Sequence, residues 1–255
     1  AAGKPVRFDR VIHTLPIAGR RIDPCDANAY RLHSGFALTA DGTEAEVATP
    51  PIRVGPGLAG GVLAAVHAGY RELRGVVPPQ LDLRGASTHV SISVPGGLCD
   101  RLAVAYSRTF APALMLLWGP ANGCGLFIRP RPGRLEFCGE FITGNRLASV
   151  SLFVAASVAF LRARIDCFPR SLPVFRPVTW PAPERLGIEV RPASYGGNLY
   201  REGRTALVTT AAGDALTAGT ALEAAWSAAR AVARALVSDE EVARLAVQRF
   251  RFPGV

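Results

Sequence analysis

The segment Thr88–Val94 alternates strictly between polar and apolar side chains, and this pattern constrains the fold more than any other part of the chain. Because successive side chains of a β-strand point to opposite faces, His89, Ser91 and Ser93 share one face, and the apolar residues occupy the other. Arg134–Phe141 alternates in a similar way. Strands with one polar face belong to sheets that meet water on one side. We therefore expect an α+β fold: a mainly antiparallel sheet with one polar, site-bearing face and helices packed on the other.

Helical patterns precede, separate and follow these two strands. Apolar residues recur at helical spacing from Leu58 to Leu73, and apolar runs predict helices at Leu98–Trp118, bent at Pro112, and at Arg146–Ile165. The stretch Leu147–Leu161 is shorter than the roughly 20 residues that a bilayer requires, so we interpret it as a buried helix.

We also expect strands at Arg10–Leu15, Gly42–Thr49 and Leu126–Ile128, and a Pro-rich turn at Pro130–Gly133. The segment Glu189–Tyr200 is expected to be irregular, and capping boxes predict helices that begin at Thr220 and Ser238. The length of 255 residues, 49% of them hydrophobic, suffices for one large domain or two small ones, and we take a single domain over residues 1–255 as the expectation.

The chain is strongly basic, with a net charge of +9 and 29 basic residues, of which only Lys4 is a lysine. Clustered basic residues would favour nucleic acid as a partner. Here the arginines are scattered, which favours either a compositional bias or a compact anion, because guanidinium groups bind carboxylates and phosphates in pairs. A flat salt dependence of association would exclude nucleic acid altogether.

The five cysteines show no C-x-x-C spacing, so neither a zinc ribbon nor a disulfide framework is predicted. A cytoplasmic location and no membrane partner are the corresponding expectations, because no apolar segment typical of a signal peptide follows Lys4. No G-x-x-x-x-G-K-[ST] motif occurs, which excludes the usual P-loop chemistry.

Three predicted strands offer charged or metal-binding side chains. His89 and Glu136 lie on the polar faces described above, and Glu44 and Glu46 share a face of a third strand. Mg²⁺ accompanied by nucleotide phosphates takes one or two carboxylates in addition to phosphate oxygens. The alternative is that each face is simply solvated and carries surface ion pairs.

Four segments in order resemble motifs of one family. They are Glu44-Ala-Glu-Val-Ala-Thr-Pro-Pro, Thr88-His-Val-Ser-Ile-Ser-Val, Phe110-Ala-Pro-Ala-Leu-Met-Leu-Leu and Arg134-Leu-Glu136. Together they resemble the carboxylate–amine ligases related to glutamate–cysteine ligase type 2, which have the glutamine-synthetase-like fold. The resemblance covers roughly residues 40 to 145, with a weaker tail to about 210 that includes Arg191, Tyr195 and Gly196.

The resemblance implies an ATP-dependent ligase that activates a carboxylate as an acyl phosphate, which an amine then attacks to form an amide. Its partners would be a small-molecule carboxylate and amine, and its cofactors ATP and Mg²⁺. Carried over onto this sequence, the resemblance implies that Mg²⁺ binds to Glu46, His89 and Glu136, with Glu44 as a further candidate. It also implies catalytic roles for Glu136 and Arg134. Arg131 or Arg134 would bind the polyphosphate. The weaker tail of the resemblance adds Arg191 and Tyr195 as substrate candidates. The polar loop of residues 195–204 adds Asn198 as a substrate candidate and Arg201 and Arg204 as nucleotide candidates.

The sequence departs from the pattern of the family at more than one place. Family members begin with a G-x-E-x-E strand, whereas here the nearest candidate, Val11–Leu15, offers only His13, and Ser91 replaces a second family histidine. Either the first metal-binding strand lies outside this sequence, or the site is a reduced one. The alternative function is thus a pseudoenzyme, or a binding or scaffold protein of the same fold. The pattern leaves homo-oligomerisation open.

Overall fold

The computed structural model describes residues 5–119, 123–167, 170–179 and 186–243. The chain divides into two compact units, one made of residues 1–53 and 60–86 and the other of residues 54–59 and 87–255. Both are built from antiparallel sheets and helices, which confirms the predicted α+β class. A single ligase-like domain over the whole chain stays a prediction.

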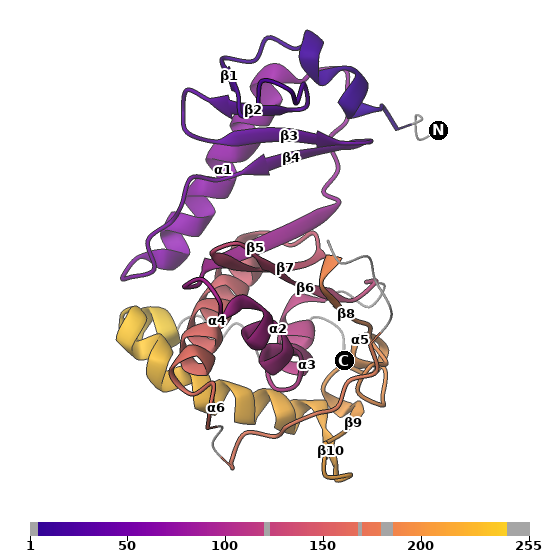
Figure 1. Cartoon of the computed structure of the whole chain (residues 1–255), viewed down its shortest axis with the longest axis vertical. Coiled ribbons are helices and arrows are strands. Elements are labelled where there is room, and N and C mark those ends of the chain that lie inside the picture. The colour runs from indigo at the N-terminus through magenta and orange to yellow at the C-terminus, as the bar shows by residue number, and fades with distance from the viewer. Residues whose placement is uncertain (1–4, 120–122, 168–169, 180–185, 244–255) are drawn as a thin grey trace. The chain divides into compact units, whose positions relative to one another are not determined.

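The first unit is a four-stranded antiparallel sheet, in the order β1-β2-β3-β4, with one long helix (Figure 1). Its elements are η1 (Phe8–Arg10), η2 (Ile12–Thr14), β1 (Gly19–Arg21), β2 (Ala29–Leu32), β3 (Ala37–Asp41), β4 (Glu44–Ala48) and α1 (Leu58–Val76). Phe8, Ile12, Phe36 and Leu38 form its core. A Cβ at Gly69 of α1 would lie 3.2 Å from the Phe36 and Val47 side chains, so this glycine lets the helix approach the sheet closely.

The prediction of a strand at Arg10–Leu15 is wrong, because the short helices η1 and η2 occupy this segment. The Thr14 hydroxyl donates to the Val11 carbonyl at 2.7 Å, and the backbone N–H groups of Thr14 and Leu15 donate to carbonyls three residues earlier. Ile12 is fully buried, so one side of the turn packs into the core. The apolar residues had suggested a strand, but local side-chain bonding favours a turn.

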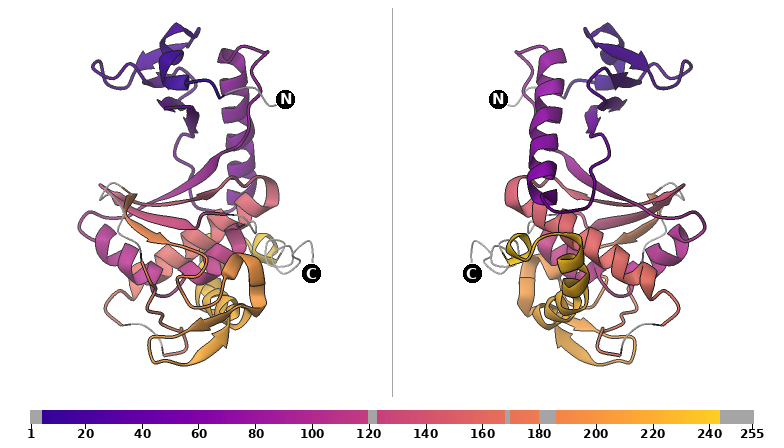
Figure 2. Two further views of the ribbon diagram at one scale, coloured as in Figure 1. Left: turned by 90° about the vertical axis from the view of Figure 1, so that its right-hand side faces the viewer. Right: turned by 90° about the vertical axis from the view of Figure 1, so that its left-hand side faces the viewer.

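The second unit is built on a four-stranded antiparallel sheet in the order β5-β7-β6-β8. Its strands are β5 (Ser87–Ser93), β6 (Leu126–Arg131), β7 (Arg134–Glu140) and β8 (Ile188–Val190), with a separate hairpin of β9 (Leu207–Thr209) and β10 (Ala215–Thr217). Its helices are α2 (Cys99–Ser107), α3 (Ala111–Trp118), α4 (Gly144–Ala163), α5 (Leu199–Glu202), η4 (Gly203–Thr205) and α6 (Ala218–Leu236). As Figures 1 and 2 show, the helices lie on one side of the sheet, where α2 contacts β6, β7 and β8 and α4 contacts β5.

The single helix expected at Leu98–Trp118 is two helices, α2 and α3, separated by three residues. Pro112 lies in the first turn of α3. Proline removes a backbone donor and is tolerated where a helix begins, so it marks a new helix instead of bending an old one. All eight residues of α3 are buried.

The Pro-rich turn expected at Pro130–Gly133 is shorter than predicted, because β6 continues through Pro130 to Arg131. Pro130 pairs only with Leu135 of β7, since β8 covers β6 only at residues 126–128. A proline is acceptable at such an edge position of a strand. The turn is then Pro132-Gly133, with Gly133 at φ +72°, and Arg129 and Arg131 become strand residues.

Two helix starts differ from the predicted capping boxes. The cap of α6 is Thr217, whose side chain accepts from the Thr220 backbone N–H, while Glu223 pairs with Arg204. The Ser238 hydroxyl accepts from the Glu241 backbone N–H as expected, but the Glu241 carboxylate bonds to the start of α1. The described part of the helix after Ser238 covers residues 239–243. The segment at Glu189–Tyr200 includes the end of β8 and the start of α5, with turns between them.

Helix α4 is, within the described residues, the helix that is long and apolar enough to cross a membrane by length and composition. In this unit 78% of its apolar window is buried, and it packs against α6, α3 and α2. These contacts are those of a core helix, which agrees with the interpretation of Leu147–Leu161 as a buried helix.

Candidate functional site

The polar face of the β5-β7-β6-β8 sheet gathers the strongest cluster of chemical groups. The strand register places Ser91, Glu136 and Arg129 side by side across three strands, and His89 beside Cys138 in the neighbouring row. Side chains directly opposite one another in an antiparallel pair lie about 5 Å apart at their Cβ atoms. Residues from β5, β6 and β7 therefore meet around Glu136.

The Glu136 carboxylate is surrounded by three guanidinium groups. Oε1 lies 3.4 Å from Arg129 Nη1 and 3.6 Å from Arg131 Nε, and Oε2 lies 3.8 Å from Arg134 Nη2. The Ser91 hydroxyl donates to Oε2 at 3.4 Å, and the Cys138 thiol donates to Oε1 at 3.8 Å. The Glu136 side chain is 11% exposed, so these partners replace most of its contact with water.

The same cluster offers ligand atoms for a cation. One ligand atom each from His89, Glu136 and Cys138 lies within 4.8 Å of the other two. A carboxylate oxygen and an imidazole nitrogen suit many divalent ions, whereas a thiolate is a ligand for softer metals. Glu136 and His89 therefore offer ligand atoms that a divalent cation accepts, and binding of Mg²⁺ by them stays a prediction.

Arg129, one of the scattered arginines that suit a compact anion, has Glu136 as a specific partner in the structure. Its side chain is 16% exposed, its guanidinium lies 5.5 Å from the centre of the Phe127 ring, and its Nε atom is buried with no hydrogen-bond partner among the described residues. The sequence predicts a turn from Pro130 and a strand that ends at Ile128, and this prediction does not place Arg129 beside Glu136. The alternation of Phe127, Arg129 and Arg131 was the available signal.

Two further carboxylates of this sheet have other partners. Glu189 pairs with Arg191 at 2.5 Å, and Glu140 Oε1 accepts from the Cys124 backbone N–H at 3.0 Å. Arg191, a substrate candidate, therefore lies at the β8 edge of the sheet in an ion pair.

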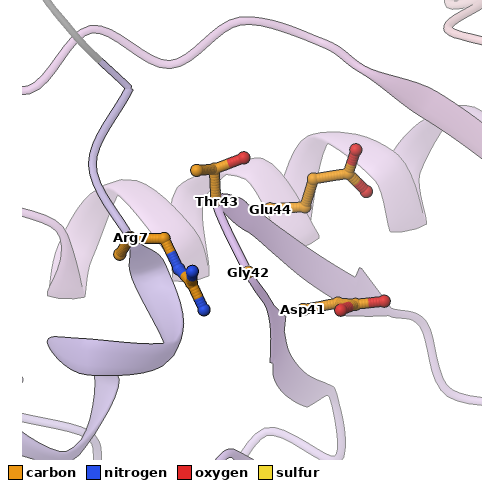
Figure 3. Close-up of a pocket in the computed structure, with 5 residues that line it drawn as sticks. All are labelled: Arg7, Asp41, Gly42, Thr43 and Glu44. Atoms are coloured by element: carbon orange, nitrogen blue, oxygen red, sulfur yellow. The ribbon is translucent and has the colours of Figure 1, made fainter.

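Glu44 and Glu46 belong to the first unit, where they lie on the same side of β4. Glu44 lines a shallow pocket of about 420 Å³ with Arg7, Asp41, Gly42 and Thr43. Figure 3 shows the Asp41 and Glu44 side chains extending to the same side of the hairpin. Convergence of Glu44 or Glu46 with His89 and Glu136 stays a prediction.

The polar loop of residues 195–204 is largely occupied with structure. The Tyr195 hydroxyl donates to the Ser107 carbonyl at 2.7 Å, and the side chain is buried against Phe175. Asn198 caps α5 by accepting from two backbone N–H groups. These contacts favour an anchoring role for Tyr195 and Asn198 over the predicted contact with substrate.

The nucleotide candidates of the same loop form ion pairs. Arg201 contacts Glu202 at 3.2 Å, with 78% of the Arg201 side chain exposed, and Arg204 contacts Glu223 at 2.5 Å. Exposed pairs of this kind contribute little to stability and exchange readily. Binding of a nucleotide by Arg201 and Arg204 stays a prediction.

The ring of Tyr200, which belongs to the same loop, packs against Gly119 and Gly123. It is packed so closely that a Cβ added to Gly119 would lie 2.2 Å from its ring, and one added to Gly123 would lie 2.9 Å from it. Burial raises the pKa of the Tyr200 hydroxyl well above its usual value, and the nearby Glu140 and Cys124 raise it further. Tyr200 thus remains neutral at physiological pH.

The fold and this face define an α+β protein with an arginine-rich sheet surface that holds a buried carboxylate. No family model and no curated protein matches the chain. Among solved structures, the chain is similar to the Pup ligase PafA of the prokaryotic ubiquitin-like modification pathway, solved in complex with ADP, with 13% sequence identity and a TM-score of 0.48. The similarity covers 96% of this chain and 63% of that ligase.

Proposed function

We propose that this protein is an ATP-dependent ligase that joins a small-molecule carboxylate to an amine, acting in the cytoplasm. The observation that carries the proposal is the meeting of His89, Glu136 and three arginines on one open sheet face. Phosphoryl transfer depends mainly on positioning and on neutralising charge. The ordered motifs that resemble carboxylate–amine ligases support the same reaction.

In this reaction a substrate carboxylate oxygen attacks the γ-phosphorus of ATP, and the bond to ADP breaks. The amine nitrogen then attacks the acyl carbon and loses a proton to solvent, phosphate leaves with the electron pair of its bond to that carbon, and the amide forms. Arg129, Arg131 and Arg134 would hold the polyphosphate through charge-assisted hydrogen bonds. Bound Mg²⁺ would neutralise phosphate charge, and His89 and Glu136 would hold it. Metal binding by Glu46 and Glu44 of the first unit is a separate prediction.

The test is ATP binding in Mg²⁺ buffer, followed by ADP release with panels of acids and amines. We expect Glu136→Gln and His89→Ala each to weaken binding of Mg²⁺–ATP by about tenfold or more, because each removes a ligand. Asp166→Asn is the matched control, since Asp166 is an exposed carboxylate paired with Arg101. Absence of Mg²⁺–ATP binding by the unmodified protein would overturn the proposal.

The second candidate is a binding or scaffold protein that has lost catalysis. The observation that favours it is that the nearest candidate for the two-glutamate strand of the family, Val11–Leu15, contains the short helix η2 and offers only His13 as a ligand. This candidate fails if the unmodified protein turns over ATP with an acid and an amine, and Glu136→Ala abolishes that turnover while the circular dichroism spectrum is unchanged.

A further inference from the structure

The arginines around Glu136 have a consequence for the order in which ligands bind. Three guanidinium groups lie within 3.8 Å of its oxygens, which leaves this part of the face with two more positive charges than negative ones. A divalent cation placed against Glu136 would meet three like charges a few ångströms away, in a partly buried setting where Coulomb interactions are stronger than in water. The carboxylate of Glu136 already forms ion pairs with all three arginines.

An anion meets the opposite situation. The buried Nε of Arg129 lacks a hydrogen-bond partner among the described residues, and buried donors are normally satisfied. A phosphate oxygen would satisfy it, and a polyphosphate would neutralise the surplus charge and draw the guanidinium groups away from Glu136. The carboxylate oxygens would then be released for a cation that already accompanies the phosphates.

We propose that the polyphosphate must bind this face before, or together with, the divalent cation, and that the three arginines prevent the cation from binding alone. This inference rests on the proposed use of Glu136 and His89 as metal ligands. It adds a regulatory property: the site responds to the metal–nucleotide complex and is insensitive to the concentration of the unbound metal ion.

The experiment measures calorimetric binding of two separate probes, Mn²⁺ alone and inorganic tripolyphosphate alone, to the full chain. We expect tripolyphosphate to bind. Against a reference titration of Mn²⁺ into tripolyphosphate without protein, Mn²⁺ should bind at least about tenfold more tightly to the protein with tripolyphosphate than to the protein alone. The double variant Arg129→Gln/Arg131→Gln removes two positive charges, so it should gain binding of Mn²⁺ alone and lose binding of tripolyphosphate. Adding His89→Ala to it should abolish the gain.

The matched control is Arg129→Lys/Arg131→Lys, which keeps both charges and should still exclude Mn²⁺ alone. Tight binding of Mn²⁺ alone by the unmodified protein, lost in His89→Ala, would overturn the inference while leaving the proposed ligase intact. Binding of tripolyphosphate without any binding of ATP would overturn the proposed function and leave the anion-first order standing. Circular dichroism verifies that each variant is folded.

Discussion

Glu241 Oε1 accepts a 2.7 Å hydrogen bond from the backbone N–H of Ala59, and Glu241 Oε2 accepts a second, at 3.0 Å, from Gly57. Gly57 and Ala59 belong to the second unit, so Glu241 satisfies backbone groups of its own unit, and the N–H of Ala59 lies 182 positions earlier in sequence. The first N–H groups of a helix have no partner within the helix, and a negative charge there is favourable. Because Glu241 is 5% exposed, water cannot readily replace it.

Replacement of Glu241 by alanine should therefore lower the free energy of unfolding by about 1–3 kcal/mol, because two donors lose their acceptor. Glu241→Gln should cost less, since one oxygen remains. Urea denaturation followed by circular dichroism gives the values. Glu240→Ala, at the exposed neighbouring position, is the control; an equal loss in both alanine variants would show that the two hydrogen bonds do not matter.

Gly139→Ala should destabilise the protein by about 1–3 kcal/mol through overpacking. A Cβ at this position would lie 2.7 Å from Trp118 Nε1, and that indole also donates to the Glu140 carbonyl at 2.8 Å. Thermal unfolding measures the loss, and a shift in tryptophan fluorescence should accompany it. Gly96→Ala serves as the comparison, because a Cβ there would have no neighbour within 4 Å. Equal melting temperatures for the two variants would refute this argument.

Tyr195→Phe separates an anchoring role from a contact with substrate. The variant loses the 2.7 Å hydrogen bond to the Ser107 carbonyl, so stability should fall by about 0.5–1.5 kcal/mol while ATP and tripolyphosphate affinities stay unchanged. Denaturant unfolding and calorimetry provide the two readouts. A loss of ligand affinity with unchanged stability would restore Tyr195 to the ligand site.

The polar faces around His89 and Glu136 could be predicted from sequence because alternation along a strand is a local property. The pairing of Arg129 with Glu136 could not, because it depends on where β6 ends and on the register with β7. The same holds for Glu241: its spacing from Ser238 is a local signal for a capping box, whereas its actual partner is set by tertiary packing. Short strands such as β1 and β9, of three residues each, carry too little pattern to be predicted.

Alkaline pH should destabilise the protein through its buried tyrosines. Burial raises the pKa of Tyr200, as it does the pKa values of Tyr106 and Tyr195. A phenol is neutral when protonated, so the folded state keeps this proton at a pH where the unfolded chain, with a pKa of about 10, releases it. The stabilisation is therefore complete below about pH 9 and is lost progressively as the pH rises above 10. Urea midpoints between pH 8 and 11 should fall steeply above pH 10, and tyrosinate absorbance should rise together with unfolding. Tyr200→Phe should flatten this decline, because one of the linked protons is removed; a decline equally steep in the variant would contradict the assignment to Tyr200.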